Sequence, residues 1–257
     1  MGLSNSAIAL TNLLVAFIGM WLLFHYWSEK QTIQNFARNI VRDLKDPNQE
    51  VLALCAAIYK LRTLLLPNHP GDPHFIPLVG FSALGATPAN ILHKGGCCSG
   101  LTRLAIVSLH SLGYKAWQIA LYHMHGNAQH CLLEVSVAGR NILIDPTYGF
   151  YYVDDVGAPL SFSQLREGQR PSFACLPGST KSDYPQNDYY NFDYQCTKTT
   201  NWTKSLLRKT SYLLLYFFTI GRIDRVKQPS FAEWPQLILV ICLCGISLII
   251  NSYLFTF

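Results

Sequence analysis

The sequence predicts an α+β domain held between two transmembrane helices, and three observations lead to this fold class. Every charged residue lies between Glu29 and Glu233, so the first 28 and the last 24 residues carry no charge. The first half of the charged region has apolar residues at helical spacing, whereas the region after Gly113 alternates between apolar and polar residues, as strands do. Helices followed by a run of strands are typical of an α+β domain.

The composition excludes two broad classes of protein. The chain has 257 residues, of which 50% are hydrophobic and 14% are charged. Soluble domains usually carry about 25% charged residues, so part of this chain is apolar without matching charge. This excludes an ordinary soluble globular protein. It also excludes a disordered chain, which would have few hydrophobic and many charged residues. The net charge of +5 is too small for a nucleic-acid-binding surface, and no nucleic-acid partner is expected.

Both uncharged ends are long enough to cross a bilayer. Residues 7–27 and 237–257 are mostly apolar, and about 20 helical residues span the hydrocarbon core. We interpret the first segment as a retained anchor rather than a cleaved signal peptide. No Lys or Arg precedes it, and the bulky Trp27 stands where a signal peptide has a small residue. Pro235 comes just before the second segment, as at many helix starts. We therefore expect a two-pass membrane protein.

The basic residues near the two segments predict their orientation. All of them lie on the side of the middle region: Lys30, Arg38, Arg42, Lys45, Arg222, Arg225 and Lys227. Because loops rich in Lys and Arg stay on the cytoplasmic side, we expect the middle region in the cytoplasm. The lipid bilayer is the expected partner. A membrane-bound acceptor or a membrane protein complex is the further partner that this arrangement suggests.

The chain divides into four parts. Residues 1–28 form the N-terminal anchor, residues 29–200 the folded domain, and residues 237–257 the second transmembrane helix. Between the last two, residues 201–236 form a basic and apolar segment near the membrane, suited to contact with anionic headgroups. Within it, residues 212–220 are apolar but too few to span a bilayer. They predict a core strand, a buried helix or an interfacial element.

Three helical patterns open the folded domain. The first covers residues 32–45, and the second covers residues 49–66 and carries an apolar stripe. A loop rich in proline and glycine occupies residues 68–88. The third pattern covers residues 99–112 and ends at Gly113, because glycine often follows the last residue of a helix.

Two or three strand patterns follow the helices, at residues 114–122, 130–137 and 140–144. Ala138 and Gly139 join the last two as a short hairpin turn. Residues 157–201 are polar, aromatic and rich in turn-forming residues, without a clear period. We therefore expect a small antiparallel sheet after the third helix.

Cys97 and Cys98 are the cysteines best placed for chemistry. They follow a pair of glycines and open the third helix. A thiol in the first turn of a helix meets unpaired N–H groups and the positive end of the helix dipole, and both favour the nucleophilic thiolate. Cys55 and the two cysteines of the second span suit packing. A disulfide between Cys175 and Cys196 would require the domain to lie in an oxidising compartment.

The strands supply a candidate base for such a thiol. His130 begins one strand, and Asp145 ends the next. In a hairpin turning at Ala138 and Gly139, the two residues fall on neighbouring strands within about one pair of each other. An imidazole that takes a thiol proton needs a carboxylate or amide on its other nitrogen. A surface histidine and an Asp-Pro turn are ordinary features separately, but their order after a helix-start cysteine rarely arises by chance.

This order resembles the transglutaminase-like superfamily of papain-type cysteine enzymes. The resemblance covers roughly residues 31–155. It rests on Gly96-Cys97-Cys98 before a helix that ends at Leu112-Gly113-Tyr114, on His130 followed by Glu134-Val135, and on Asp145-Pro146-Thr147-Tyr148-Gly149. The family's spacing from the thiol to the helix-ending glycine fits Cys98 as the nucleophile, with Cys97 in a variable position. The resemblance also implies His130 as the general base and Asp145 as the orienting group.

The family implies a fold with N-terminal helices, a central helix that starts at the cysteine, and an antiparallel sheet that carries the histidine and the aspartate. It implies a hydrolase or acyltransferase that works through an acyl-thioester. Transamidating members have a Trp upstream of the thiol, whereas this chain has none between Trp27 and Trp117, so protein crosslinking is not expected. The Cys98 N–H is one expected oxyanion donor, and Asn90 or His93 is a candidate for the second. Cys97, next to the thiol, is a further candidate for contact with the substrate or its oxyanion.

A different class of function remains open. The domain could keep this fold with a silent thiol and act as a binding or scaffold subunit of a membrane assembly. In that case the two spans would be docking surfaces, and their polar residues Asn12 and Asn251 would make contacts between helices.

A metal site is the third alternative. It would combine Cys97 and Cys98 with His123, His125 or His130. Adjacent cysteines do not give the spacing of a closed tetrahedral zinc site, so we expect neither a metal nor a cofactor.

Overall fold

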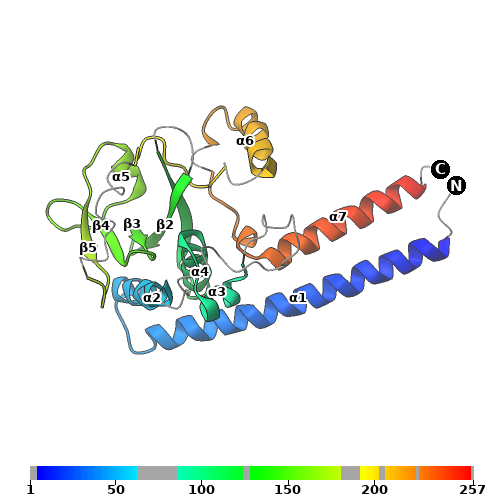
Figure 1. Ribbon diagram of the computed structural model, residues 1–257, viewed down its shortest axis with the longest axis horizontal. Helices are drawn as coiled ribbons and strands as arrows, with labels where there is room; N and C mark the ends of the chain where they lie inside the picture. The colour runs from blue at the N-terminus through cyan, green and yellow to red at the C-terminus, as the bar shows by residue number, and fades with distance from the viewer. Residues whose placement is uncertain are drawn as a thin grey trace.

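Two long helices, α1 (Asn5–Val41) and α7 (Pro235–Phe255), project side by side from a domain of shorter helices and a sheet (Figure 1). The structure, a computed structural model, describes residues 5–62, 86–123, 128–180, 192–202, 206–223 and 226–255. Most of the loop predicted at residues 68–88 lies outside the described residues, and so does His125. The mixed α+β class predicted from the sequence is confirmed.

Both long helices are long and apolar enough to cross a membrane. Their large apolar side chains are mostly exposed, including Leu13, Phe17 and Leu248. The two helices are joined by polar contacts: the Asn12 amide donates to Asn251 Oδ1 at 3.1 Å, and the Ser247 hydroxyl donates to Asn12 Oδ1 at 2.9 Å. The contact between helices suggested for these two asparagines is therefore made within the chain itself.

The helix α1 continues well beyond the first apolar segment. It reaches Val41, so the helical pattern predicted at residues 32–45 is the end of α1 and stops four residues earlier than predicted. No glycine or proline lies between Gly19 and Pro47 to break the chain. The buried Glu29 then ties this helix to its neighbours, accepting hydrogen bonds from Thr87 at 3.0 Å and Gln236 at 2.9 Å.

Three shorter helices pack beside α1: α2 (Pro47–Leu61), α3 (Pro88–Lys94) and α4 (Cys98–Ser111). The side chain of Asp46 caps α2, and that of Thr87 caps α3. These caps satisfy N–H groups that a helix start would otherwise leave unpaired. The third helix predicted from the sequence is α4, shifted by one residue. It ends before Gly113, whose φ of 92° glycine adopts easily.

The sheet has five antiparallel strands in sequence order. They are β1 (Lys115–Tyr122), β2 (Ala128–Val137), β3 (Arg140–Asp145), β4 (Phe150–Val153) and β5 (Ser172–Cys175). The hairpin predicted at Ala138 and Gly139 joins β2 to β3. Both turn residues have positive φ, 49° and 79°, which matches the right-handed twist of the strands. The last two strands were not predicted, because four residues are too few to show a period.

Both faces of the sheet are buried. One face packs on α2 and α4 in the main core, with Leu133 and Val135 of β2 pointing into it. The other face packs under the short helix α5 (Phe162–Arg166), with Leu132 and Leu143 among its buried residues. The helix α4 is enclosed between the sheet and the other helices, so the residue that begins it lies at the edge of the core.

A sixth helix, α6 (Leu206–Phe218), replaces the apolar element predicted at residues 212–220. It is followed by the short 3-10 helix η5 (Ser230–Glu233). Large apolar side chains of α6 are exposed, among them Leu213 and Phe217. For residues 212–220, the predicted core strand and the predicted buried helix are therefore wrong. The interfacial element stays a prediction.

Candidate active site

His130 and Asp145 form a buried hydrogen-bonded pair on neighbouring strands. His130 Nε2 lies 2.7 Å from Asp145 Oδ2. The register of the hairpin sets Leu133 opposite Ile144, which puts His130 two residues beyond the position opposite Asp145. Side chains two residues apart on a strand point to the same face, so the two residues are diagonal neighbours. The structure thus brings this predicted pair together.

The turn after β3 fixes the orientation of the Asp145 carboxylate. Its second oxygen, Oδ1, accepts hydrogen bonds from the backbone N–H groups of Thr147 at 2.7 Å and Tyr148 at 3.1 Å. Arg62, at the end of α2, donates to the Thr147 carbonyl at 3.2 Å and braces the turn. With both oxygens engaged and the side chain fully buried, the carboxylate can hold the His130 ring in one orientation.

Cys98 is the first residue of α4 and faces the same histidine. Gly95, with a φ of 76°, ends α3, and Cys97 is the residue before α4. This tight connection leaves Cys98 at the exposed end of a buried helix. The thiol interacts with His130 through a hydrogen bond and through charge. Because Nε2 is occupied by Asp145, the other ring nitrogen, Nδ1, is left for the thiol.

The charge state of His130 follows from these contacts. Burial lowers the pKa of His130, but the charge and the hydrogen bond of Asp145 raise it, and Cys98 raises it further. The net result is a pKa well above the ordinary value for histidine. The imidazole therefore holds a proton through neutral pH. That proton is available to a leaving group, and a protonated ring stabilises a thiolate beside it.

A cavity of about 160 Å³ opens at the sulfur. The residues that line it come from α4, β1, β2, α6 and the segment before α6: Cys98, Ser99, Arg103, Gln118, Ala128, Gln129, His130, Cys131, Asn201 and Arg208. Gln118 on β1 is buried and lines this cavity, and its side-chain amide carries two hydrogen-bond donors. A glutamine in an otherwise apolar strand, and an arginine inside the apolar helix α4, are signals that could have identified two of these residues from the sequence.

The tentative oxyanion residues are not brought to this cavity. Asn90 lies in α3, where its backbone N–H donates to the Thr87 hydroxyl, and His93 is exposed near the end of that helix. The Cys97 sulfur lies 3.4 Å from the Ser99 hydroxyl. None of the three lines the cavity. Gln118, by contrast, lines the cavity together with Cys98, and its amide is a donor of the kind expected from Asn90 or His93.

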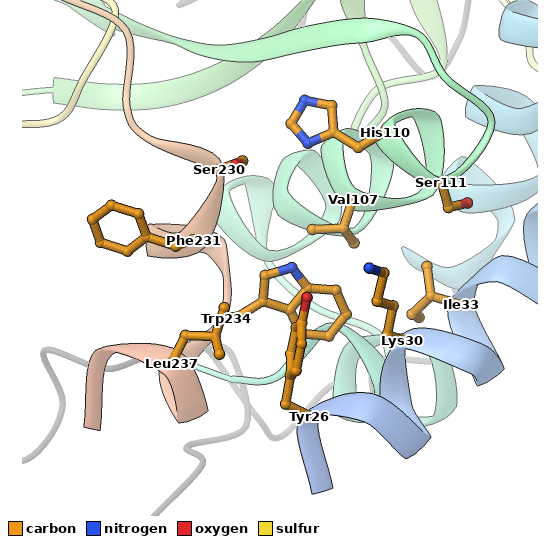
Figure 2. Close-up of a pocket in the computed structure, with 10 residues that line it drawn as sticks. All are labelled: Tyr26, Lys30, Ile33, Val107, His110, Ser111, Ser230, Phe231, Trp234 and Leu237. Atoms are coloured by element: carbon orange, nitrogen blue, oxygen red, sulfur yellow. The ribbon is translucent and has the colours of Figure 1, made fainter. Parts of the chain in front are cut away.

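A second, larger cavity of about 230 Å³ lies where the two long helices meet the domain (Figure 2). The Tyr26 and Trp234 rings, which line it, meet edge to face with centroids 5.0 Å apart, and Lys30 and His110 are also among its lining residues. Neither Cys98, His130 nor Asp145 lines this cavity. The candidate active site is therefore the smaller one.

The remaining cysteines do not form a competing site. Cys55 is fully buried in the main core, and burial raises its pKa to about 12, so its thiol stays protonated. Within the described part of the chain there is no disulfide between Cys175 and Cys196. Among the described residues, which do not include His125, no group of three or more side chains is arranged to hold a metal ion.

Comparisons with known proteins leave the family unassigned. No family model matches the chain, and no curated protein matches its sequence. A structure from Cytophaga hutchinsonii titled a "putative cysteine protease" is 20% identical over 46% of this chain and 37% of its own, with a TM-score of 0.33. A "putative protease" from Parabacteroides distasonis is 15% identical over 44% of this chain and 23% of its own, with a TM-score of 0.34. Likenesses this partial assign no activity to this chain.

Proposed function

We propose that the protein is a membrane-tethered thiol enzyme that transfers acyl groups through a thioester on Cys98. The observation that carries this proposal is the buried His130–Asp145 hydrogen bond with the Cys98 thiol on the other side of the imidazole. A helix that starts at the thiol and an antiparallel sheet that carries the other two residues also support a transglutaminase-like layout. In this proposal Cys98 is the nucleophile, His130 the general acid and base, and Asp145 the orienting group.

The first half of the reaction acylates the enzyme. The Cys98 sulfur attacks the carbonyl carbon of an amide or ester, a C–S bond forms, and the carbonyl π electrons move to the oxygen. The Cys98 N–H and the Gln118 amide are the donors that would stabilise this oxyanion. The C–N or C–O bond then breaks, and His130 gives its proton to the leaving amine or alcohol.

The second half releases the acyl group. Water or an amine attacks the thioester carbonyl while His130 takes a proton from it, and the C–S bond breaks to return the Cys98 thiolate. The proton that His130 gave away in the first half is thereby restored. Because no Trp precedes the thiol in the domain, we propose hydrolysis or transfer to a small acceptor rather than protein crosslinking.

The membrane part of the proposal rests on α1 and α7. Residues 1–28 and 237–257 would anchor the chain, residues 29–200 would form the catalytic domain, and residues 201–236 would lie near the membrane. The basic residues beside the two spans support a cytoplasmic domain. The boundary after residue 28 lies within α1, so the anchor and the domain share one continuous helix.

Two single substitutions in the full-length, detergent-solubilised protein test the proposed function. Cys98→Ala should lower turnover of a p-nitrophenyl ester by roughly three orders of magnitude or more, because it removes the thiol that interacts with His130. Cys97→Ala is the matched control and should retain turnover, with circular dichroism confirming that both variants fold. Turnover that survives Cys98→Ala, or falls equally in both variants, would contradict the proposal. A silent thiol together with a stoichiometric copurifying partner would instead favour the scaffold alternative.

A further inference from the structure

The wall of the Cys98 cavity is cationic. It carries two guanidinium groups, Arg103 from α4 and Arg208 from α6, and no carboxylate belongs to the described residues that line it. The sulfur and the two cations therefore face the same small space. A cavity wall of one charge sign favours a ligand group of the opposite sign.

The two arginines are positioned by different contacts. Arg103 is buried, its Nε lies 3.3 Å from Glu233 Oε2, and one of its terminal nitrogens donates to the Ala86 carbonyl at 2.7 Å. The second oxygen of Glu233 accepts from Gln228 at 2.8 Å. Glu233 therefore fixes the Arg103 side chain from outside the cavity.

Arg208 reaches the cavity from α6 and donates to the Asn201 carbonyl at 3.3 Å. Burial lowers the pKa of the Arg208 guanidinium, the positive charge of Arg103 lowers it further, and Glu233 raises it. The two cations thus lie close enough to disfavour each other. An anionic group bound between them would relieve that repulsion and gain charge-assisted hydrogen bonds.

The cavity is too small for a whole substrate. Its volume of about 160 Å³ compares with roughly 300–1,000 Å³ for sites that enclose a drug-sized ligand. It can hold the reacting carbonyl and one small charged group beside Cys98. The remainder of a substrate must lie outside, along the surface next to α6.

The outer surface of α6 is apolar. Its exposed large side chains, with that of Ile220 just after the helix, are Leu213, Leu214, Tyr216, Phe217, Phe218 and Ile220. Along the long axis of the molecule, α6 lies level with the beginning of α7 (Figure 1). If α7 crosses a bilayer, its first turn lies at the bilayer surface, and α6 lies there too. An exposed apolar helix beside two spans is typical of an interfacial element.

We propose that the Cys98 cavity binds the phosphate or carboxylate group of an anionic amphiphile in the bilayer surface, with Arg103 and Arg208 as the binding residues. The apolar part of this amphiphile lies along α6 in the lipid. This inference deepens the proposed function and rests on it. It names the class of molecule from which Cys98 would take an acyl group, or to which Cys98 would pass one.

Protection of Cys98 from iodoacetamide tests the inference without requiring turnover. The full-length protein is placed in phosphatidylcholine vesicles, and alkylation of Cys98 is followed by mass spectrometry. Dodecyl phosphate should slow alkylation, whereas dodecanol and inorganic phosphate at equal concentration should not. Arg208→Gln should weaken the protection by dodecyl phosphate about tenfold or more, whereas Arg208→Lys should retain part of it. Lys209→Gln is the matched control, because Lys209 is the next residue on α6, and this variant should keep the full protection.

The outcomes separate the inference from the proposed function. Equal protection by inorganic phosphate would mean that a free anion suffices, and it would overturn the lipid assignment. Equal protection by dodecanol, or unchanged protection in Arg208→Gln, would overturn the anionic site. A wild-type protein without ester turnover would contradict the proposed function but not the anionic site, because the protection of Cys98 does not depend on turnover.

Discussion

Replacing Asp145 by Asn is expected to slow the alkylation of Cys98 near neutral pH. Oδ1 of Asp145 accepts two backbone hydrogen bonds, so the oxygen of an asparagine would take that position and its NH₂ group would face His130. Nε2 of His130 would then have to accept a hydrogen bond, which places the ring proton on Nδ1. A neutral ring with its proton toward Cys98 cannot take the thiol proton.

The size of the effect follows from the contact that is lost. Asp145 is fully buried, and its 2.7 Å hydrogen bond to His130 is charge-assisted. Such bonds contribute about 1.5–3 kcal/mol, and each 1.36 kcal/mol is a factor of ten in an equilibrium between protonation states. Proton transfer from the thiol to His130 becomes less favourable by this factor, and the rate of alkylation should fall with it, roughly ten- to hundredfold.

The assay is the rate of iodoacetamide alkylation between pH 5 and pH 9, followed by mass spectrometry of the peptide that contains Cys98. Asp154→Asn is the matched control, because Asp154 also accepts two backbone hydrogen bonds, from Val156 and Ala158, in the turn after β4. An Asp145→Asn protein alkylated at the wild-type rate throughout this range would show that Asp145 does not set the tautomer of His130. An equal slowing by Asp154→Asn would do the same.

Three further predictions concern the fold. The pKa of His130 is raised in the folded state, so its contribution to stability is complete below about pH 6.5, the ordinary histidine value. This contribution is lost as the pH rises through the folded-state pKa. Chemical denaturation should therefore show that the wild-type protein loses stability relative to His130→Gln as the pH rises. Gly149→Ala should lower the free energy of unfolding by about 1–3 kcal/mol. The φ of Gly149 is 74°, and the new Cβ would lie 2.7 Å from Ser179 Cβ. An unchanged melting temperature would contradict this prediction. Asn12→Leu should remove the hydrogen bonds to Asn251 and weaken helix pairing by about 0.6 kcal/mol, measured by unfolding in detergent.

The parts of the site predicted from the sequence depend on local signals. Ala138 and Gly139 set the hairpin register, and the register alone makes His130 and Asp145 neighbours. A glycine pair before an apolar helix pattern placed Cys98 at a helix start. Each of these signals spans only a few residues, and the backbone conformation that each requires is narrow.

The parts that escaped prediction depend on contacts between distant segments. Arg208 reaches the Cys98 cavity from α6, and a single sequence contains no signal that couples two positions so far apart. Asn90 and His93 are near Cys98 in the chain. The turn at Gly95 separates α3 from α4, however, so closeness in sequence does not bring their side chains to the sulfur.

Direct detection of an acyl-enzyme tests the central claim, that Cys98 becomes acylated in the cavity it shares with His130. The wild-type protein is mixed with a p-nitrophenyl ester, quenched in acid, digested and examined by mass spectrometry. We predict a hydroxylamine-sensitive acyl group on the peptide carrying Cys97 and Cys98, which persists in Cys97→Ala and is absent in Cys98→Ala and His130→Gln. An acyl group that persists in Cys98→Ala, or turnover without any acylated peptide, would show that the reaction does not pass through a thioester on Cys98.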